Sequence, residues 1–173
     1  ETGEGLSNLD YAYIAQELGK NSLASECLNC AAPDTGNMEV LERVGTPEQK
    51  KRMLPGLIAG KERACFAVTE PNTGLNTRKI KTMAKREGDR YIVTGQKVWT
   101  STAQTADLAM LLARTDPDAP KHQGISYFVI PMDQPGIEVR PLREMTGHAV
   151  FNEVFLDGAR VRAVDVVGEL NKG

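Results

Sequence analysis

The sequence has little of what three classes of protein need: metal ligands, long apolar runs and an excess of positive charge. Its two histidines, His122 and His148, are isolated, and no other ligand type is spaced near them as a metal site requires. No run approaches the roughly 20 apolar residues that cross a bilayer. A formal net charge of -2, with both signs spread along the 173 residues, builds no basic face for nucleic acid. We therefore expect no metal site, no membrane span and no nucleic-acid partner.

Cysteine is also scarce. Cys27 and Cys30 form a Cys-x-x-Cys pair inside a helical pattern, but no second pair or histidine cluster completes a zinc site. We expect both to be buried, reduced thiols, because cysteine behaves as a small hydrophobic residue. The acidic, glycine-rich opening at residues 1–5 does not resemble a signal peptide. These features favour a reducing compartment: the cytoplasm, or the mitochondrial matrix if the protein is eukaryotic.

The first sixty residues carry helical patterns separated by turn formers. We predict helices at residues 7 or 8 to 18, 21 or 22 to 31, 38–44 and 47–58. Gly19 should end the first helix in the left-handed conformation, and Pro33–Asn37 should break the second. Thr46 and Gln49 have the spacing of a capping box at the start of the last helix, and Pro55 should end or kink that helix.

From Ala64 onward the pattern changes to strands. We predict them at residues 65–69, 80–86, 91–94, 96–102, 107–114, 125–131, 137–141 and 150–156, with a short end strand after Val161. Glu87–Arg90 has the composition of a hairpin turn, and Gly95 should separate two strands. Helices followed by strands indicate an α+β fold, with a compact barrel-like or sandwich-like β body.

Two stretches carry the functional signal. Cys65–Thr69 is a small apolar strand that Glu70-Pro71 ends, and Asn72-Thr73-Gly74 follows as a loop in which Gly74 is able to take a positive φ. Gln96–Thr102 contains the chain's one tryptophan, Trp99, followed by three residues with hydroxyl groups.

This order of phrases resembles the flavin-contacting core of the acyl-CoA dehydrogenases. Thr115–Pro120, preceded by Leu111–Arg114, and Phe151–Asp157, followed by Arg160-Val161, agree with the same family. The resemblance implies a partial N-terminal helical domain at residues 1–62, a middle β-barrel domain at 63–167 and the start of a linker at 168–173. It also implies a C-terminal helical bundle that these residues do not include, so we expect a fragment of a larger enzyme.

The resemblance implies FAD as cofactor and assigns residues to it. Thr69 falls where the family places a hydroxyl donor near flavin N1 and the C2 carbonyl, and Ser101 where it places a donor to N5. Trp99 would pack against the ring. The implied cofactor-binding residues are Phe66, Val68, Thr69, Gly74, Leu75, Trp99, Thr100 and Ser101, and the implied substrate-binding residues are Gly74, Leu75 and Asn76.

Leu75 departs from the family pattern. Many relatives have a serine there that contacts the flavin pyrophosphate and bound acyl-CoA. A leucine side chain cannot donate a hydrogen bond. Pyrophosphate binding at this loop would therefore depend on backbone N–H groups or on other residues.

No catalytic base is expected among these residues, because the family supplies it from the C-terminal bundle. Abstraction of a substrate α-proton needs a base within hydrogen-bond reach. Glu70 lies in a turn, where acids usually accept bonds from nearby backbone N–H groups. Glu144 and Glu153 fall in strand-edge or loop phrases and should be solvated. We expect the fragment itself to be inactive.

The leading functional prediction is an FAD-dependent acyl-CoA dehydrogenase that oxidises acyl-CoA to trans-2-enoyl-CoA. Its implied partners are the acyl-CoA substrate, an electron-transfer flavoprotein as acceptor, and further subunits in a homo- or hetero-oligomer, a dimer or tetramer. Three alternatives remain open: a non-catalytic partner subunit of a heteromeric enzyme, a flavin oxidase or monooxygenase of the same fold, and a β-barrel binding module unrelated to flavin.

Overall fold

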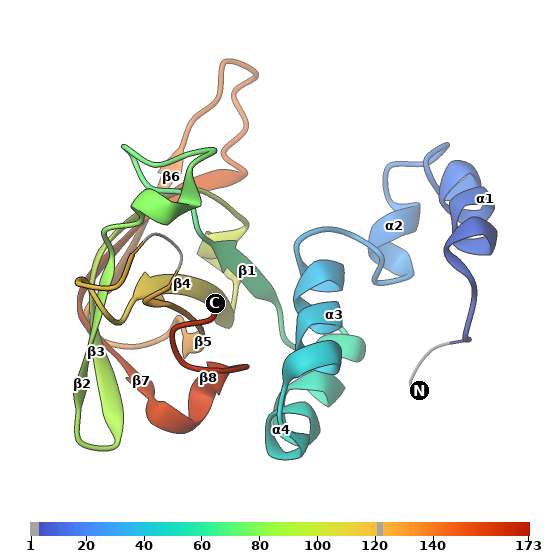
Figure 1. The fold of residues 1–173 in the computed structure, drawn as a ribbon. Helices are drawn as coiled ribbons and strands as arrows, with labels where there is room; N and C mark the ends of the chain where they lie inside the picture. Colours follow the sequence, from blue (N-terminus) through green and yellow to red (C-terminus); the bar gives the residue numbers. More distant parts are fainter. Residues whose placement is uncertain (1–3, 121–122) are drawn as a thin grey trace.

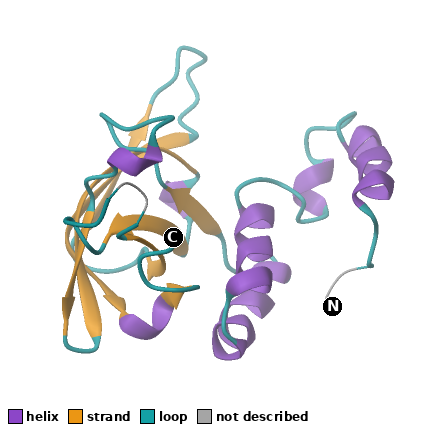
Figure 2. Cartoon of the chain, in the orientation of Figure 1, coloured by secondary structure: helices purple, strands orange, loops and turns teal. Residues whose placement is uncertain are grey.

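The computed structural model describes residues 4–120 and 123–173. Four helices come first, and a single eight-stranded sheet follows (Figures 1 and 2). The predicted α+β class is therefore confirmed. His122, for which we predicted no metal, lies outside the described residues. Among the described residues, none of the helices has the length and apolar character that crossing a membrane requires.

The first two helices lie away from the sheet (Figure 1). α1 (Asn8–Leu18) begins at a capping box formed by Ser7 and Asp10, and it has no buried residue. Gly19 has φ -63°, so the prediction of a left-handed stop there is wrong. α2 (Ala24–Cys27) is only four residues long, shorter than the helix predicted from residue 21 or 22 to 31. The helix ends before Cys30, and Cys27 is exposed, so the prediction of two buried thiols is also wrong.

The next two helices pack against the sheet. α3 (Asp34–Val44) starts four residues earlier than predicted, because Asp34 accepts a 2.6 Å hydrogen bond from the Ala64 amide and Asn37 is buried against the same strand. α4 (Pro47–Ile58) has the predicted capping box. Pro55 does not end α4: the helix continues through it to Ile58.

The strands form one mixed sheet in the order β6-β7-β3-β2-β4-β5-β8, with β1 pairing parallel to β4 off this path. Their bounds are β1 (Ala64–Ala67), β2 (Met83–Glu87), β3 (Arg90–Ser101), β4 (Leu108–Arg114), β5 (Ile125–Pro131), β6 (Ile137–Leu142), β7 (Phe151–Arg162) and β8 (Val166–Val167). Side chains from both halves of the order, such as Val93 and Val154 on one side and Leu111 and Phe128 on the other, share one core. The sheet therefore curls around its own interior.

The β2–β3 hairpin forms where predicted, with Gly88 at φ +61° in the turn. Gly95 does not separate two strands, because β3 runs through it without a break. A Cβ at Gly95 would lie 2.7 Å from the Thr82 Cα, so a side chain there would collide with the backbone of the segment leading into β2. Glycine at this position lets β3 pass close to that segment and remain continuous as far as Ser101.

The helices and the sheet meet in a second apolar core. Leu41 and Leu57 from α3 and α4 pack with Met110 and Val129 from β4 and β5. The helical part thus covers one side of the sheet beside β1 (Figure 1). α4 ends at Ile58 and β1 begins at Ala64, and the exact domain limits stay predictions.

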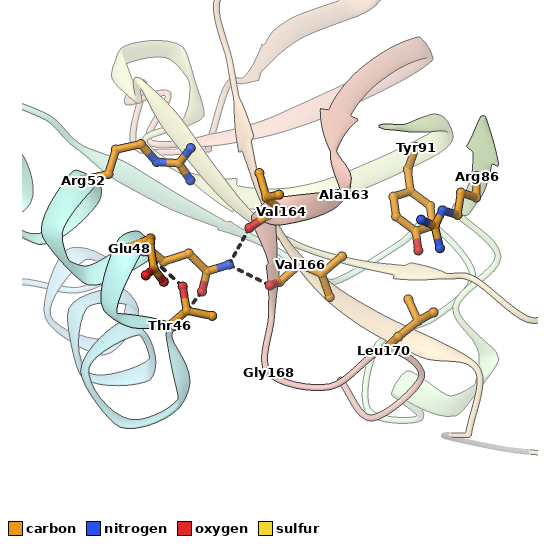
Figure 3. Close-up of a pocket in the computed structure, with 11 residues that line it drawn as sticks. Thr46, Glu48, Arg52, Arg86, Tyr91, Ala163, Val164, Val166, Gly168 and Leu170 are labelled. Atoms are coloured by element: carbon orange, nitrogen blue, oxygen red, sulfur yellow. Dashed lines mark hydrogen bonds between the residues drawn. The ribbon is translucent and has the colours of Figure 1, made fainter. Parts of the chain in front are cut away.

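The side chain of Gln49 joins α4 to β8 and the segment before it, and we call its hydrogen bonds to the Val164 and Val166 carbonyls the clamp. Gln49 is 2% exposed, and its Nε2 group donates to the Val164 and Val166 carbonyls at 2.8 and 2.7 Å (Figure 3). A cavity of about 570 Å³ lies beside it, between the start of α4 and the segment from Ala163 to Leu170. Tyr91, near the start of β3, also lines this cavity. The cavity is therefore far from Trp99, which is near the end of the same strand.

Candidate functional site

The two stretches that carried the functional signal lie side by side. β1 ends at Ala67, and the chain then passes along β3 through Val68 and Thr69. The Val98 amide donates to the Thr69 carbonyl at 2.9 Å, and the Lys97 ammonium donates to the Val68 carbonyl at 3.0 Å. Thr69 is therefore held against the part of β3 that contains Trp99 and Ser101.

A β-bulge sets the direction of the tryptophan. Lys97 pairs with Val154 and Thr100 pairs with Asn152, so Val98 and Trp99 together face a single residue of β7. Trp99 has φ +59°, a left-handed conformation that is uncommon for a bulky residue. Simple alternation along β3 would have turned Trp99 inward with Lys97. The extra residue turns the indole outward instead, where 59% of its surface is exposed.

An aromatic neighbour supports the indole from β7. The Phe151 ring meets the Trp99 ring edge-on, with centroids 5.9 Å apart and an angle of 80° between planes. Phe66, on β1, is a further aromatic side chain with substantial exposure, at 46%. These rings are fixed by strands, so they offer apolar surface in a defined orientation.

A buried ion pair lies beneath the surface. Lys97 is fully buried, and its ammonium lies 2.9 Å from the carboxylate of Glu70, which is 7% exposed. Glu70 also accepts hydrogen bonds from the amides of Lys81 and Thr82 at 2.7 and 2.9 Å. Glu70 was predicted to accept bonds from nearby backbone N–H groups; it does accept from backbone amides, but these belong to Lys81 and Thr82, eleven and twelve residues further along the chain. Its salt bridge to Lys97 was not foreseen.

Burial and pairing act oppositely on these two groups. Burial lowers the pKa of the Lys97 ammonium to about 8, although the neighbouring Glu70 carboxylate works to raise it. Burial also works to raise the pKa of the Glu70 carboxyl, but hydrogen bonds and the charge on Lys97 outweigh it and leave this pKa below its usual value. The site therefore favours the ionised form of Glu70, whereas burial disfavours the charged form of Lys97 relative to water.

The two predicted hydroxyl donors are available. Thr69 and Ser101 are partly exposed, and neither hydroxyl group has a hydrogen-bond partner among the described residues. Thr100 differs, since it is 1% exposed and its hydroxyl points into the protein without a partner. Any contact of Thr100 with a ligand on the outer surface would have to come from its backbone.

The loop residues are open to solvent. Gly74, Leu75 and Asn76 are all exposed, and the Leu75 side chain has no packing at all, with a relative exposure of 107%. Gly74 does not take a positive φ, although its composition allowed one. A Cβ at Gly74 would meet nothing within 4 Å, so other residues would fit there as well. The loop thus imposes no backbone conformation that requires its glycine.

The donor set and the surface fit a flavin ring. A flavin presents a flat apolar face and an edge of acceptor atoms, which need exposed aromatic surface and unused N–H or O–H donors. Trp99 supplies the first, and the hydroxyls of Thr69 and Ser101 supply the second. Val68 is partly exposed beside them. Phe66 lies instead beside Tyr127 and α3, so the structure does not bring it to the same surface. In residues 4–120 and 123–173, no cluster of three or more His, Cys, Asp or Glu side chains could hold a metal ion.

Lys97 is the important residue that the sequence interpretation missed. The signal was present, because alternation from Tyr91 and Val93 places position 97 on the inner face of β3. A lysine at an inner position needs an acid nearby, and Glu70 is the acid that ends the neighbouring stretch. The sequence did not show that the two stretches would lie in contact.

Comparisons with known proteins find similarity along nearly the whole chain. Residues 65–159 match the model of the acyl-CoA dehydrogenase middle domain, and residues 1–61 match that of the N-terminal domain. The acyl-CoA dehydrogenase FadE34 of Mycobacterium tuberculosis is 45% identical over 174 residues, which cover 99% of this chain and 24% of that protein.

Two solved structures share the fold. The ChsE4-ChsE5 complex from Mycobacterium tuberculosis superposes with a TM-score of 0.84 at 31% identity, over 99% of this chain and 43% of that one. A glutaryl-CoA dehydrogenase from Mycobacterium smegmatis in complex with FADH2 has a TM-score of 0.67 at 35% identity, over 75% of this chain and 33% of that one. The chain therefore spans less than half the length of each of these relatives. It belongs to the acyl-CoA dehydrogenase family.

Proposed function

We propose that this chain is the flavin-contacting part of an FAD-dependent acyl-CoA dehydrogenase that converts acyl-CoA to trans-2-enoyl-CoA. The family membership supports the enzyme class, and the similar glutaryl-CoA dehydrogenase was solved with FADH2. The single observation that carries the proposal is the convergence of two unused hydroxyls, on Thr69 and Ser101, with the exposed indole of Trp99. The cofactor, when bound, would supply the hydride acceptor.

In this proposal the chain's own residues bind and orient the ring. The hydroxyls of Thr69 and Ser101 would donate to acceptor atoms along its edge. Donors held in place before the reaction stabilise negative charge without having to reorganise. Trp99 would cover one face, and its position on a strand, backed by Phe151, would keep that face fixed. Exclusion of water from the covered face would strengthen the two hydrogen bonds.

The base that removes the α-proton is not assigned to this chain. Glu70 is tied into an ion pair and two amide hydrogen bonds, and its pKa is held low, so it is a poor proton acceptor. Glu153 accepts a hydrogen bond from Gln96 at 2.9 Å. Glu144 accepts one from the Val150 amide. We therefore propose that these residues bind and that proton abstraction depends on a group outside them.

The proposed partners follow from the enzyme class. Gly74, Leu75 and Asn76 form the exposed loop that would contact acyl-CoA, through backbone N–H groups where a relative has serine. An electron-transfer flavoprotein would reoxidise the cofactor, and the working enzyme would be a dimer or tetramer of like or unlike subunits. We keep the cytoplasm, or the mitochondrial matrix in a eukaryote, as the proposed location.

A second candidate is a non-catalytic subunit that pairs with an active relative. Leu75 favours it, because a fully exposed leucine replaces a hydrogen-bonding side chain at the loop that should meet pyrophosphate. The ChsE4-ChsE5 complex, a similar structure, is an assembly of two different chains. The flavin content of the natural full-length protein, purified alone and read from its absorption spectrum, separates the two candidates.

The direct test is a titration of the chain with FAD, followed by the fluorescence of its single tryptophan. We expect quenching of Trp99, and we expect Thr69→Val and Ser101→Ala each to weaken binding by roughly five- to tenfold, as loss of one hydrogen bond implies. Thr94→Val is the matched control, because Thr94 is an exposed threonine elsewhere on β3. Absence of quenching, or equal weakening by the control, would contradict the proposed site.

Reduction of the full-length protein by acyl-CoA tests the chemistry. We expect bleaching of the flavin absorption on addition of acyl-CoAs of suitable length, without oxygen uptake. Rapid oxygen consumption would favour an oxidase or monooxygenase instead. Turnover by the 173-residue chain alone with an artificial acceptor would contradict the proposal that the base lies outside it.

A further inference from the structure

We propose that Lys97 is a positioning residue for the flavin site: its buried ammonium locks Thr69 onto the part of β3 that carries Trp99 and Ser101. This inference rests on the proposed function for its ligand, but the placement of the three residues can be measured without any ligand. Lys97 itself touches neither the exposed surface nor a bound ring, since it is fully buried.

Few bonds join the Thr69 segment to β3. β1 ends at Ala67, where its pairing with β4 also ends. Beyond that point three hydrogen bonds connect the segment with β3: the Val98 amide to Thr69, and the Lys97 ammonium to the Val68 carbonyl and to the Glu70 carboxylate. Lys97 supplies two of the three, so removal of its ammonium would leave a single bond.

Glu70 extends this hold to a third segment. Its carboxylate accepts hydrogen bonds from the amides of Lys81 and Thr82, which lead into β2. It also closes a tight turn, because the Glu70 and Thr73 backbones exchange two hydrogen bonds of 3.0 Å. The Lys97 ammonium therefore holds one end of the segment from Val68 to Thr73, in which the Thr69 side chain is partly exposed.

The bulge needs support of this kind. The left-handed backbone of Trp99 costs free energy and persists only when its surroundings determine it. Residues on both sides are held: Val98 by its bond to Thr69, and Thr100 by the Asn152 side chain, which donates to the Thr100 carbonyl at 3.0 Å. Without Lys97, Val98 would have a less firmly held partner, and the indole could leave its exposed position.

Stability alone is a weak reason for a buried salt bridge here. Desolvation of two charges offsets most of their attraction, and apolar replacements of such pairs are often as stable. Lys97 shows the same balance, because burial lowers the pKa of its ammonium in spite of Glu70. What an apolar residue could not do is bond to the Val68 carbonyl and the Glu70 carboxylate at once.

The test compares Lys97→Met with Asp165→Asn. Asp165 is also buried, at 4% exposure, and pairs with Arg162 and Arg52, but it lies beside the start of β3. Both variants thus weaken an ion pair that has a buried member, although the Asp165 pairs have exposed arginines, and only the first lies next to Trp99. The ligand-free readout is the near-ultraviolet circular dichroism of the single tryptophan, which requires a fixed ring environment. The second readout is the FAD titration.

We expect Lys97→Met to lose most of the tryptophan band at a temperature where its far-ultraviolet spectrum remains native, and to bind FAD about tenfold more weakly because preorganisation is lost. Asp165→Asn should keep both properties. An unchanged band and unchanged affinity in Lys97→Met would overturn the inference. An equal loss in Asp165→Asn would also overturn it, since the effect would then be general instability.

Two further outcomes remain decisive. If the wild-type chain does not bind FAD, the proposed function fails for this chain, and the tryptophan band alone decides the role of Lys97. If Lys97→Met does not fold, Glu70→Gln takes its place, because the amide keeps an acceptor for the ammonium but loses the charge. We then expect a partial loss of the band, and an unchanged band would overturn the inference.

Discussion

Replacement of Gln49 by leucine tests how the helical part is fixed to the end of the sheet. The Gln49 side chain makes three hydrogen bonds: to the Val164 and Val166 carbonyls, and from the Thr46 amide to its Oε1 atom at 2.9 Å (Figure 3). Leucine is close to glutamine in size and can make none of them. The variant therefore removes polar contacts without opening a large cavity.

The expected loss of stability follows from the number of hydrogen bonds removed and from the exposure of the groups that they leave unpaired. Each hydrogen bond contributes about 1 kcal/mol, and a buried acceptor left without a donor costs about 1–3 kcal/mol more. Val164 is 67% exposed and a cavity adjoins the clamp, so water can reach the freed carbonyls and reduce the second cost. We expect Gln49→Leu to lower the free energy of unfolding by about 2–3 kcal/mol.

Urea unfolding followed by far-ultraviolet circular dichroism measures this loss. With an m-value of about 2 kcal/mol/M, the midpoint should fall by roughly 1–1.5 M. Gln16→Leu is the matched control, because Gln16 is an exposed glutamine on α1, and its midpoint should change by less than ~0.3 M. A loss below about 1 kcal/mol for Gln49→Leu would refute the reasoning, since the three bonds would then contribute almost nothing.

Two further predictions concern ionisable groups. Burial lowers the pKa of Lys97 to about 8 in the folded chain. Above that pH the lysine of the unfolded chain keeps its proton while the folded chain loses it, so stability increases as pH rises. The free energy of unfolding of the wild type, relative to that of Lys97→Met, should therefore rise between pH 8 and 9.5 by at most ~1.4 kcal/mol per pH unit. Urea midpoints of both proteins across this range measure it, and a flat difference would contradict the burial of a charged ammonium. Burial raises the pKa of the Cys65 thiol to about 12, so in the native chain iodoacetamide at pH 8 should label the exposed Cys27 at least about tenfold faster than Cys65. Peptide mass spectrometry after a timed reaction checks this, and equal labelling in urea is its control.

Local signals in the sequence predicted features whose bonds span three or four residues. The Thr46–Gln49 capping box forms because both partners lie within one turn, and the hairpin turn at Gly88 forms because glycine tolerates a positive φ. The order of helices and strands was predictable for the same reason. The prediction for the start of α3 was wrong, because contact with β1, thirty residues away, decides where that helix begins. The predicted length of α2 was also wrong.

Part of the candidate site was also predictable. The residue types at Thr69, Trp99 and Ser101 indicated hydroxyl donors beside an indole, and the structure brings the two stretches together by hydrogen bonds. The sequence did not indicate that Trp99 would point outward, because alternation along β3 predicts the opposite. One extra residue, set against β7, reverses the direction of the ring. A bulge is a property of the pairing of two strands and cannot be read from one of them.

The sequence by itself determined which side chains were available: two hydroxyls, one indole, and an acid beside a proline at the end of an apolar strand. Only the tertiary structure decided that Lys97 would lie inside, against Glu70, and so tie together two stretches that are twenty-seven residues apart. The physical reason is that a buried ammonium must find an acceptor, and the curled sheet is what brings one within 3 Å.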